Sequence, residues 1–375
     1  MKNIKNIIDI TFFFILIAMK KCLFFKGVRL TGSQLNIILP KDSYSGMAKG
    51  ATLLYNEIKQ KNRKVNLIQY QNLNEIEKNS LNIIHANPPA LPKIILKIGI
   101  YKFLNCENYG YWAWEVSDLP FRYKIAAKLF KKIIVPTEYV KTVFNDNGLN
   151  NVKVYPHKIQ FDQNFGTNTK ESIDENRLLK IGTIFNFGSD IERKNPFILV
   201  EALRNFAGIQ VFIKTHNGKR NPEQYSKLQN LISDTDSFHL IDEDWSSQQI
   251  NDFIRSCDLF VSTHRAEGFG LTIAQSILLY TPVMVTNWSG NAEFINPDYS
   301  YALDYELVKP DIINNRNLEG LNFLWADVQV DEIKRKFSKF LIDFEKNRLT
   351  KMNILAYEYL LSYLNKYNLE SILED

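Results

Sequence analysis

The stretch HRAEGFGLTIAQSILLYTPVMVTNWSGNAEFI, from His264 to Ile295, decides the fold of this chain. It follows the apolar run Asp258–Ser262 and contains a second one, Pro282–Thr286, and both look like buried strands. Between them lie a glycine-rich turn and an amphipathic helical pattern. A strand, a turn, a helix and a strand in this order form a βαβ unit, so the sequence predicts an α/β fold with a parallel sheet.

The turn of this unit carries two glycines and a carboxylate. The first backbone N–H groups of a helix have no intrahelical partner, and the helix dipole adds partial positive charge, so this end attracts anions such as phosphate. Gly268 and Gly270 remove Cβ atoms where a ligand could approach the backbone, and Phe269 is expected to pack beneath the loop. A tight turn without a ligand would use the same residues, so the neighbouring segments must decide between the two interpretations.

Strand-like runs alternate with helical patterns along the rest of the chain, in two series. The first series is Leu35–Pro40, Val65–Gln69, Leu81–His85 and Lys132–Pro136, and the second is Leu178–Phe185, Ile209–Lys214, His239–Ile241 and the stretch quoted above. This pattern predicts two Rossmann-like domains that face each other across a cleft. We expect an N-terminal domain at 25–160, a polar linker at 161–176, a C-terminal domain at 177–345, and a helix at 346–375 that could return to the N-terminal domain.

Composition narrows the function. The 375 residues are 45% hydrophobic and carry a net charge of +5. This balance fits a phosphate-bearing ligand or an anionic membrane surface, but it lacks the basic stripe of a nucleic-acid-binding protein. Cys22, Cys106 and Cys257 have neither the number nor the spacing of a disulfide framework or a zinc site, which favours the reducing cytosol.

The N-terminal segment 1–24 is apolar and basic. Its run Ile10–Met19 is flanked by Lys2, Lys5, Lys20 and Lys21. The run is shorter than the roughly 20 residues of a spanning helix, and no small-residue cleavage site follows it. An anchor on the membrane surface, an ordinary buried element, and a span or signal all remain open. The first predicts a peripheral protein on the inner face of the cytoplasmic membrane.

Five segments resemble glycosyltransferase family 4, whose members are retaining sugar transferases of the GT-B fold, and in particular its bacterial members of the mannosyl and rhamnosyl transferase type that build surface polysaccharides. They are Ser45–Gly50, Ile84–Asn87, Gly110–Glu115, Ile191–Pro196 and the run from Glu267 through Thr281 to Glu293. They occur in family order over about residues 34–345. The resemblance implies transfer of a sugar from a nucleotide diphosphate sugar to a glycan or lipid-linked acceptor.

The resemblance also implies the roles of individual residues. The implied catalytic residues are Glu267, Lys194, His85 and Glu115. The donor is expected to contact Arg193, Gly268, Phe269, Gly270, Leu271, Gln275 and Gly46, and the acceptor Asn87, Trp112 and Trp114. Lys214 joins the donor set because it ends a strand, and ligands bind at the carboxyl ends of strands in open α/β sheets. No metal or other cofactor is expected, since cations and helix-end amides can stabilise the leaving phosphate.

Two positions depart from the family pattern. Gln275 stands where the family has a second glutamate that holds the nucleotide ribose, and an amide can still bond a ribose hydroxyl with less charge assistance. Asn87 stands where many members have a second histidine, which puts a general-base histidine in doubt.

Structural alternatives stay open for each class of residue. The cations Arg193, Lys194 and Lys214 could be solvated surface residues, Glu267 could be a helix cap, and His85 could be a core histidine. Trp112 and Trp114 could belong to the core. The triplets Asp234–Asp236 and Asp242–Asp244 resemble a metal site, but we interpret them as caps of helical patterns such as Ser246–Ile254.

Two further classes of function are compatible with the sequence. A catalytically degenerate paralogue that binds glycans or nucleotide sugars would explain Gln275 and Asn87. Another GT-B enzyme, such as a nucleotide-sugar epimerase, would need no acceptor groove. Retention of Glu267 and Lys194 argues against decay, so we favour the glycosyltransferase.

Overall fold

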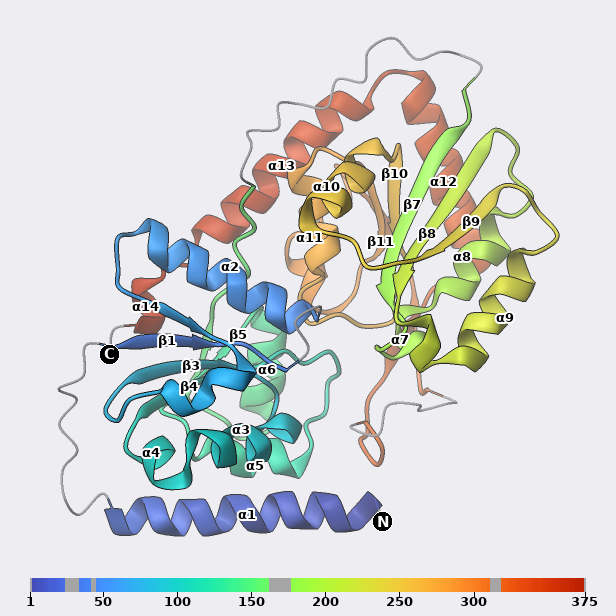
Figure 1. Ribbon diagram of the computed structural model, residues 1–375. Helices are drawn as coiled ribbons and strands as arrows, with labels where there is room; N and C mark the ends of the chain where they lie inside the picture. Colours follow the sequence, from blue (N-terminus) through green and yellow to red (C-terminus); the bar gives the residue numbers. More distant parts are fainter. Residues whose placement is uncertain (1, 24–33, 42–44, 162–176, 311–317, 374–375) are drawn as a thin grey trace. The chain divides into compact units, whose positions relative to one another are not determined.

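The computed structural model describes residues 2–23, 34–41, 45–161, 177–310 and 318–373, which form two compact units (Figure 1). Unit 1 comprises Met1–Gln160 and Tyr367–Asp375, and unit 2 comprises Phe161–Lys366. The predicted linker lies outside the described residues except for Phe161. The predicted boundary at residue 345 falls between two helices of unit 2, and of the predicted C-terminal segment 346–375 only Tyr367–Asp375 belongs to unit 1.

The described residues of unit 1 form a parallel six-stranded sheet in the order β2-β1-β3-β4-β5-β6. The strands are β1 (Leu35–Ile38), β2 (Asn66–Ile68), β3 (Leu81–His85), β4 (Glu107–Tyr111), β5 (Lys132–Val135) and β6 (Val152–Val154). The helices are α1 (Lys2–Leu23), α2 (Gly46–Gln60), α3 (Leu91–Ile98), α4 (Ile100–Leu104), α5 (Phe121–Ala127), α6 (Glu138–Asp146) and α14 (Glu370–Leu373), with short 3-10 turns η2 (Tyr70–Glu75) and η3 (Pro88–Ala90).

Helix α2 shows why the sequence folds locally as it does. The Ser45 hydroxyl caps the helix by accepting a hydrogen bond from the Ala48 amide (3.2 Å). Ala51, Leu54 and Ile58 recur on one face and pack on strand residues such as Ile37 and Ile83 in the core of unit 1.

A ladder of asparagine side chains fixes the register of four strands. The Asn66 amide donates to Asn36 (3.0 Å), Asn36 donates to Asn82 (2.8 Å), and Asn82 donates to Asn108 (3.0 Å). Asn108 then donates to the carbonyl of Phe103 (2.8 Å). Asn36, Asn82 and Asn108 are buried, and a one-residue slip would leave their amides unpaired, so the ladder favours one alignment of β2, β1, β3 and β4.

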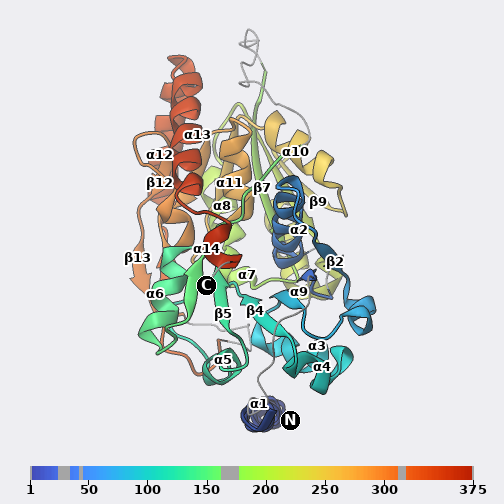
Figure 2. The ribbon, with the colours of Figure 1, turned by 90° about the vertical axis from the view of Figure 1, so that its left-hand side faces the viewer.

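Helix α1 lies along unit 1 and packs against α3, α4 and α5 (Figure 2). Its inner face buries Phe13 and Leu16 completely, whereas Ile7, Ile8 and Ile15 on its outer face are exposed. The buried face agrees with the alternative of an ordinary buried element, and the membrane-surface anchor stays a prediction. None of the helices among the described residues is both long and apolar enough to span a membrane.

The described residues of unit 2 form a second parallel sheet, in the order β12-β11-β10-β7-β8-β9. Its strands are β7 (Leu179–Asn186), β8 (Ile209–His216), β9 (Phe238–Asp242), β10 (Leu259–Ser262), β11 (Val283–Thr286) and β12 (Tyr301–Leu303), and β13 (Glu306–Val308) pairs antiparallel with β14 (Trp325–Asp327). The helices are α7 (Ile191–Lys194), α8 (Pro196–Leu203), α9 (Pro222–Ile232), α10 (Ser247–Ser256), α11 (Leu271–Leu278), α12 (Val330–Glu345) and α13 (Leu349–Asn365), with 3-10 turns η4 (Gly218–Arg220) and η5 (Ser289–Glu293).

The βαβ unit predicted between Asp258 and Thr286 is β10–α11–β11, and the two strands pair in parallel as expected. The two Rossmann-like sheets confirm the predicted α/β class. The carboxyl ends of the adjacent strands β7, β10 and β11 meet at one edge of the unit 2 sheet, which brings three loops together there.

Candidate active site

Three loops at the carboxyl edge of the unit 2 sheet form the candidate site. The Arg265 amide donates to the carbonyl of Arg193 (2.7 Å), which joins the loop after β10 to α7. The Gly290 amide donates to the carbonyl of Glu267 (2.8 Å), which joins the loop after β10 to η5. These backbone bonds fix the three loops relative to one another and so fix the side chains that they carry.

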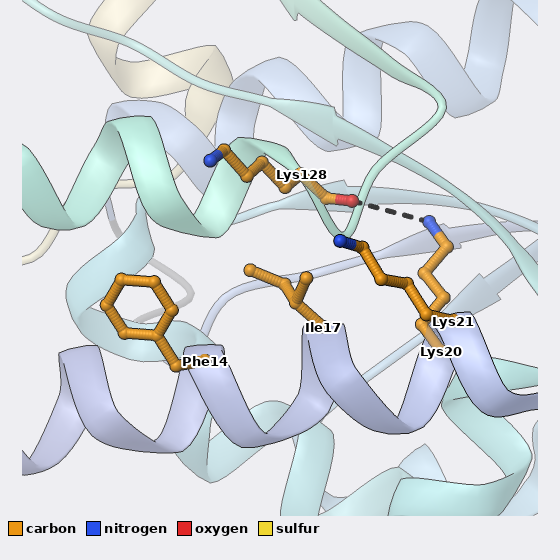
Figure 3. A pocket seen from close by; sticks show the side chains of 5 residues that line it. All are labelled: Phe14, Ile17, Lys20, Lys21 and Lys128. Atoms are coloured by element: carbon orange, nitrogen blue, oxygen red, sulfur yellow. Dashed lines mark hydrogen bonds between the residues drawn. The ribbon is translucent and has the colours of Figure 1, made fainter.

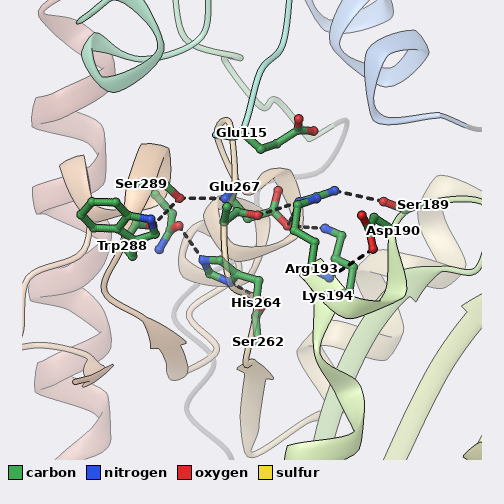
Figure 4. Close-up of polar contacts among 12 residues, drawn as sticks. Glu115, Ser189, Asp190, Arg193, Lys194, Ser262, His264, Glu267, Trp288 and Ser289 are labelled. Carbon is green, nitrogen blue, oxygen red and sulfur yellow. Dashed lines mark hydrogen bonds and ion pairs between the residues drawn. The ribbon is translucent and has the colours of Figure 1, made fainter. Parts of the chain in front are cut away.

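Glu267 lies between two cations in this site (Figure 4). Its carboxylate accepts a hydrogen bond from the Lys194 ammonium, and Arg193 Nη1 lies 3.4 Å from the same oxygen. Burial alone would raise the pKa of Glu267, but the charges of Lys194 and Arg193 outweigh it and lower the pKa to about 2. Glu267 is therefore a carboxylate at neutral pH.

The two cations differ in how tightly the fold holds them. Arg193 is buried and donates to the carbonyl of Ala266 (2.6 Å) and to the Ser189 hydroxyl (3.0 Å), so it supports both loops. The Lys194 side chain is 22% exposed and is held in the candidate site by Glu267. Lys194 is thus the cation that an incoming anion can reach with the smaller rearrangement.

Local structure fixes where Lys194 lies. Asp190 caps α7 by accepting from the Arg193 amide (3.4 Å), and Asn195 ends the helix in the left-handed conformation (φ 49°). Thr263 donates to the carbonyl of Asn195 (2.7 Å) from the next strand end. The one-turn helix therefore holds Lys194 beside the loop after β10.

His264 joins the loop after β10 to the loop after β11. Its Nε2 lies 2.8 Å from Asn291 Oδ1, and its Nδ1 lies 3.0 Å from the Ser262 hydroxyl (Figure 4). The Asn291 amide donates to the carbonyl of Thr286 (2.9 Å), so His264 Nε2 carries the proton and Nδ1 accepts from Ser262. Burial lowers the pKa of His264 to about 4, which keeps the ring neutral at neutral pH.

The segment after β11 supports the Glu267 loop through its backbone. The Ser289 hydroxyl accepts from the Glu267 amide (2.7 Å) and donates to the carbonyl of Trp288 (2.6 Å). A Cβ atom on Gly290 would lie 2.2 Å from the carbonyl oxygen of Gly268, so only glycine fits. Sequence reasoning did not assign His264, Ser289, Gly290 or Asn291, although all four stand inside the quoted stretch.

The glycine turn enters α11 as the sequence predicts. Gly270 adopts φ +85°, which disfavours other residues, and Leu271 begins the helix. Phe269 is buried and packs on Phe294 with a ring separation of 5.2 Å, as expected for the residue between the glycines. Glu267 and Gly268 therefore lie just before the start of α11. The backbone amides at this helix start have no intrahelical partners and favour the binding of an anion.

Two residues predicted to bind the donor have partners within unit 2. Gln275 is 1% exposed and its amide donates to Asn251 of α10. The Lys214 ammonium donates to the carbonyls of Thr215 (2.6 Å) and Glu243 (2.5 Å) and lies over the Trp245 ring. The donor contacts of Gln275 and Lys214 remain predictions. To contact a donor, each side chain would have to give up its present hydrogen-bond partners.

In unit 1, the strand ends bring aromatic and imidazole rings together. His85 ends β3 and stacks on Tyr111 at the end of β4, with a ring separation of 4.3 Å. Tyr111 stacks on His157 at 5.0 Å and donates to the carbonyl of Tyr155 (2.7 Å). Both nitrogens of the fully buried His85 ring lack a hydrogen-bond partner within the described part of the chain.

The remaining residues predicted for unit 1 are placed as follows. Asn87 pairs both groups of its amide with the backbone of Ala113 (2.8 and 3.1 Å), so it holds the loop after β4. Trp112 and Trp114 are buried, which favours the core interpretation. Glu115 is half-buried in the same loop, and Gly46 is exposed at the start of α2.

The acidic triplets do not cap the following helix, so that interpretation is wrong. Ser246 caps α10 in a capping box with Gln249, because Ser246 directly precedes the helix, whereas Asp244 lies two residues earlier. Asp242 instead accepts from the Gly218 amide (3.1 Å), and Asp234 pairs with Arg204 (2.7 Å). Among the described residues, no three His, Cys, Asp or Glu side chains are grouped as a metal ion would require.

Residues 169–315 match the family model of glycosyl transferases group 1. No curated protein matches the chain. The family match supports a glycosyltransferase, and it covers the loops that carry Lys194 and Glu267.

Solved structures with the same fold extend over both units. S. aureus TarM, in complex with Fondaparinux, alpha-GlcNAc-glycerol and UDP, has a TM-score of 0.52 at 16% identity over 87% of this chain, which spans 57% of that protein. Anabaena Alr3699/HepE with UDP and glucose has a TM-score of 0.58 at 12% identity, over 89% of this chain and 97% of that one. A glycosyltransferase from Rickettsia africae has a TM-score of 0.64 at 15% identity, over 91% and 99%. These likenesses confirm the GT-B fold.

Proposed function

We propose that the protein is a retaining glycosyltransferase that moves a sugar from a nucleotide diphosphate sugar to a glycan or lipid-linked acceptor in cell-surface polysaccharide synthesis, at the inner face of the cytoplasmic membrane. The observation that carries this proposal is the buried Glu267 carboxylate held between Lys194 and Arg193 beside the N-terminus of α11. This arrangement offers positive charge for a diphosphate and negative charge for a sugar ring.

The two signs of charge suit the reaction. When the bond between the anomeric carbon and the diphosphate oxygen breaks, negative charge develops on the diphosphate and positive charge on the sugar ring. Lys194 can exchange its contact with Glu267 for a phosphate oxygen, which frees the carboxylate to face the sugar. The acceptor hydroxyl then bonds to the anomeric carbon on the same face, and its proton passes to the leaving diphosphate.

Rigid support of the loops contributes to the same step. Preorganised donors stabilise a developing charge without reorganising during the reaction. The Glu267 amide is held by the Ser289 hydroxyl, and the loop is held by His264 and Gly290. We therefore assign Ser289, His264 and Gly290 to positioning rather than to contact with substrate.

The donor panel should begin with UDP sugars, because TarM and HepE are solved with UDP. UDP and GDP should be compared by thermal stabilisation, since a ligand that binds only the native state raises apparent stability. Sugar transfer to a membrane lipid or glycan extract, with the anomeric configuration of the product determined by NMR, tests the reaction. Inversion of the anomer, or donor turnover that never produces a glycoside, would contradict the proposal.

Metal independence is part of the proposal and has its own test. Lys194, Arg193 and the first amides of α11 supply the positive charge that a divalent ion would supply. We expect EDTA to leave the transfer rate within about twofold of its value in buffer. A loss of activity that manganese restores would instead assign a metal role to the acidic triplets.

A further inference from the structure

The exposed apolar side chains of unit 1 are gathered on four helices. Every exposed large hydrophobic side chain among the described residues of this unit lies on α1, α3, α4 or α5: Ile7, Ile8, Phe14, Ile15, Met19, Leu96, Tyr101 and Phe121. Exposed apolar side chains that gather on neighbouring helices mark a candidate interaction site on a folded protein. We call these four helices the docking face.

Helix α1 has apolar side chains on both its inner and its outer face. Its inner side chains Phe13 and Leu16 are buried against unit 1. Its exposed positions follow a helical period, and none between Lys5 and Lys21 is charged: Asn6, Ile7, Ile8, Thr11, Phe14, Ile15, Ala18 and Met19. A helix that turns such a stripe toward water lacks a partner for its outer face.

The docking face is also strongly basic. The four helices carry nine basic residues and one acidic residue, Asp9, although the whole chain has a net charge of only +5. The basic residues are Lys2, Lys5, Lys20, Lys21, Lys93, Lys97, Lys102, Arg122 and Lys124. Asp9 is buried, whereas Lys5, Lys21, Lys93 and Lys97 are exposed, so the four helices offer positive charge together with exposed apolar side chains.

A cavity of about 450 Å³ lies between α1 and the end of α5 (Figure 3). Phe14 and Ile17 line its apolar part, and Lys20, Lys21 and Lys128 line the rest. Lys20 ties the two helices together by donating to the carbonyl of Leu129 (3.0 Å). Within the described residues, neither Lys21 nor Lys128 pairs its ammonium with a carboxylate.

We propose that the docking face binds an anionic phospholipid bilayer, with a headgroup phosphate between Lys21 and Lys128 and with Ile8, Phe14 and Ile15 among the acyl chains. A helix with an apolar stripe and flanking lysines lies in the plane of the membrane interface, and anionic lipid strengthens its binding. A second copy of this basic face would bring like charges together, which disfavours self-association as the explanation. The inference deepens the membrane-side placement in the proposed function.

Co-sedimentation of the full chain with vesicles tests the proposal. Vesicles of phosphatidylcholine are compared with vesicles in which about one third of the lipid is phosphatidylglycerol. We expect binding to the anionic vesicles, and we expect it to weaken as salt is raised. Lys21→Glu with Lys128→Glu should reduce the partition coefficient by at least about 25-fold. The matched control, Lys64→Glu with Lys153→Glu, changes exposed lysines outside the docking face and should reduce it far less.

The apolar contribution has its own pair of variants. Ile8→Glu with Ile15→Glu should abolish vesicle binding, because both side chains would have to enter the acyl region. Ile342→Glu, at an exposed isoleucine of α12 in unit 2, is the control and should bind as the unchanged protein does. All three isoleucines are exposed, so both variants should keep the circular dichroism spectrum and the nucleotide affinity of the unchanged protein when no vesicles are present.

A fluorophore gives a second readout. Cys22 is exposed near the end of α1, whereas Cys106 is half-buried and Cys257 is buried. An environment-sensitive dye on Cys22 in a Cys106→Ser background should shift to shorter wavelength with anionic vesicles. Absence of binding to either vesicle, binding that ignores Ile8→Glu with Ile15→Glu, or a dimer formed through this face in sedimentation analysis would overturn the proposal. Since vesicle binding needs no donor, its failure is separate from failure of sugar transfer.

Discussion

The strand ends of the two sheets use opposite chemistry. In unit 2, Glu267, Lys194 and Arg193 are charged and paired with one another. In unit 1, His85, Tyr111 and His157 are stacked. Burial raises the pKa of Tyr111 and lowers the pKa of both histidines, that of His157 to about 3, so all three rings stay neutral.

Glu267 is charged and His85 is neutral because their neighbouring groups differ, since both side chains are buried. Burial opposes charge on Glu267 as it does on His85, but Glu267 has two groups of opposite charge beside it, whereas neither nitrogen of His85 has a hydrogen-bond partner within the described residues. A strand edge that keeps charges suits a diphosphate and a developing oxocarbenium ion. A strand edge that keeps neutral rings suits sugar hydroxyls and ring faces. Each prediction below changes one side of this contrast.

The largest effect is expected for Glu267→Gln. The amide keeps the size of the side chain but removes the negative charge that would face the sugar, so turnover should fall by more than about tenfold. Donor affinity should change little, because Lys194 and Arg193 remain and lose their internal counter-ion. Steady-state kinetics separates the two quantities.

Glu192→Gln is the matched control for this change. Glu192 lies on the same one-turn helix, and its ion pair is with Arg265 (3.5 Å) rather than with Lys194. It should leave turnover within about twofold of the unchanged enzyme. Equal losses in the two variants would show that Glu267 acts only by holding the loop.

Lys194→Ala should weaken nucleotide diphosphate binding by roughly tenfold and lower turnover, because it removes the more exposed of the two cations. Isothermal titration with the nucleoside diphosphate measures the affinity. Lys219→Ala, at an exposed lysine in η4 of the same unit, serves as the control. Unchanged affinity of Lys194→Ala for the nucleoside diphosphate would contradict the assignment of Lys194 to an anion-binding site.

His85→Phe probes the neutral side of the contrast. Phenylalanine preserves the stack on Tyr111 and removes two buried nitrogens without partners, so the free energy of unfolding should rise by about 1 kcal/mol. Transfer should nevertheless fall several-fold if His85 binds the sugar. His239→Phe is the control, since His239 stacks on Phe212 in unit 2 and its Nε2 also lacks a partner. Urea unfolding and turnover are measured together, and full activity of His85→Phe would assign the ring to the core.

Much of the fold could be predicted because buried parallel strands are short continuous apolar runs. The runs at β1, β3, β7 and β10 are found close to their expected bounds. Strand β4, with the sequence ENYGY, was missed because its polar and aromatic residues run directly into the tryptophan segment. The asparagine ladder was missed for a similar reason, since Asn36 and Asn82 look like interruptions in an apolar run until their strands are seen to be neighbours.

The site was predictable where one local motif carries it and not where contacts join distant loops. Glu267 and Lys194 were chosen separately from the sequence, and the structure pairs them across 73 positions of chain. The roles of His264 and Asn291 depend on a contact between two loops that no spacing rule shows. The acidic triplets misled because two carboxylates near a helix start look like caps, whereas Ser246 stands nearer to that start.

The smallest effect is expected at Gln275, where the sequence departs from the family pattern. Gln275→Glu restores a carboxylate that could accept a ribose hydroxyl, so it should change mainly the donor Michaelis constant, by a few-fold, with turnover nearly unchanged. The structure adds a cost, because the new carboxylate would be buried beside Asn251, whose amide must rotate so that its NH₂ group faces it. Thermal unfolding of Gln275→Glu should therefore show a lower melting temperature without donor and a partial recovery with donor.

Asn251→Ala, which removes the internal partner and leaves Gln275 in place, should improve donor binding if the ribose contact competes with Asn251. A large fall in turnover for Gln275→Glu, with no effect of Glu267→Gln, would show that the two positions have exchanged roles.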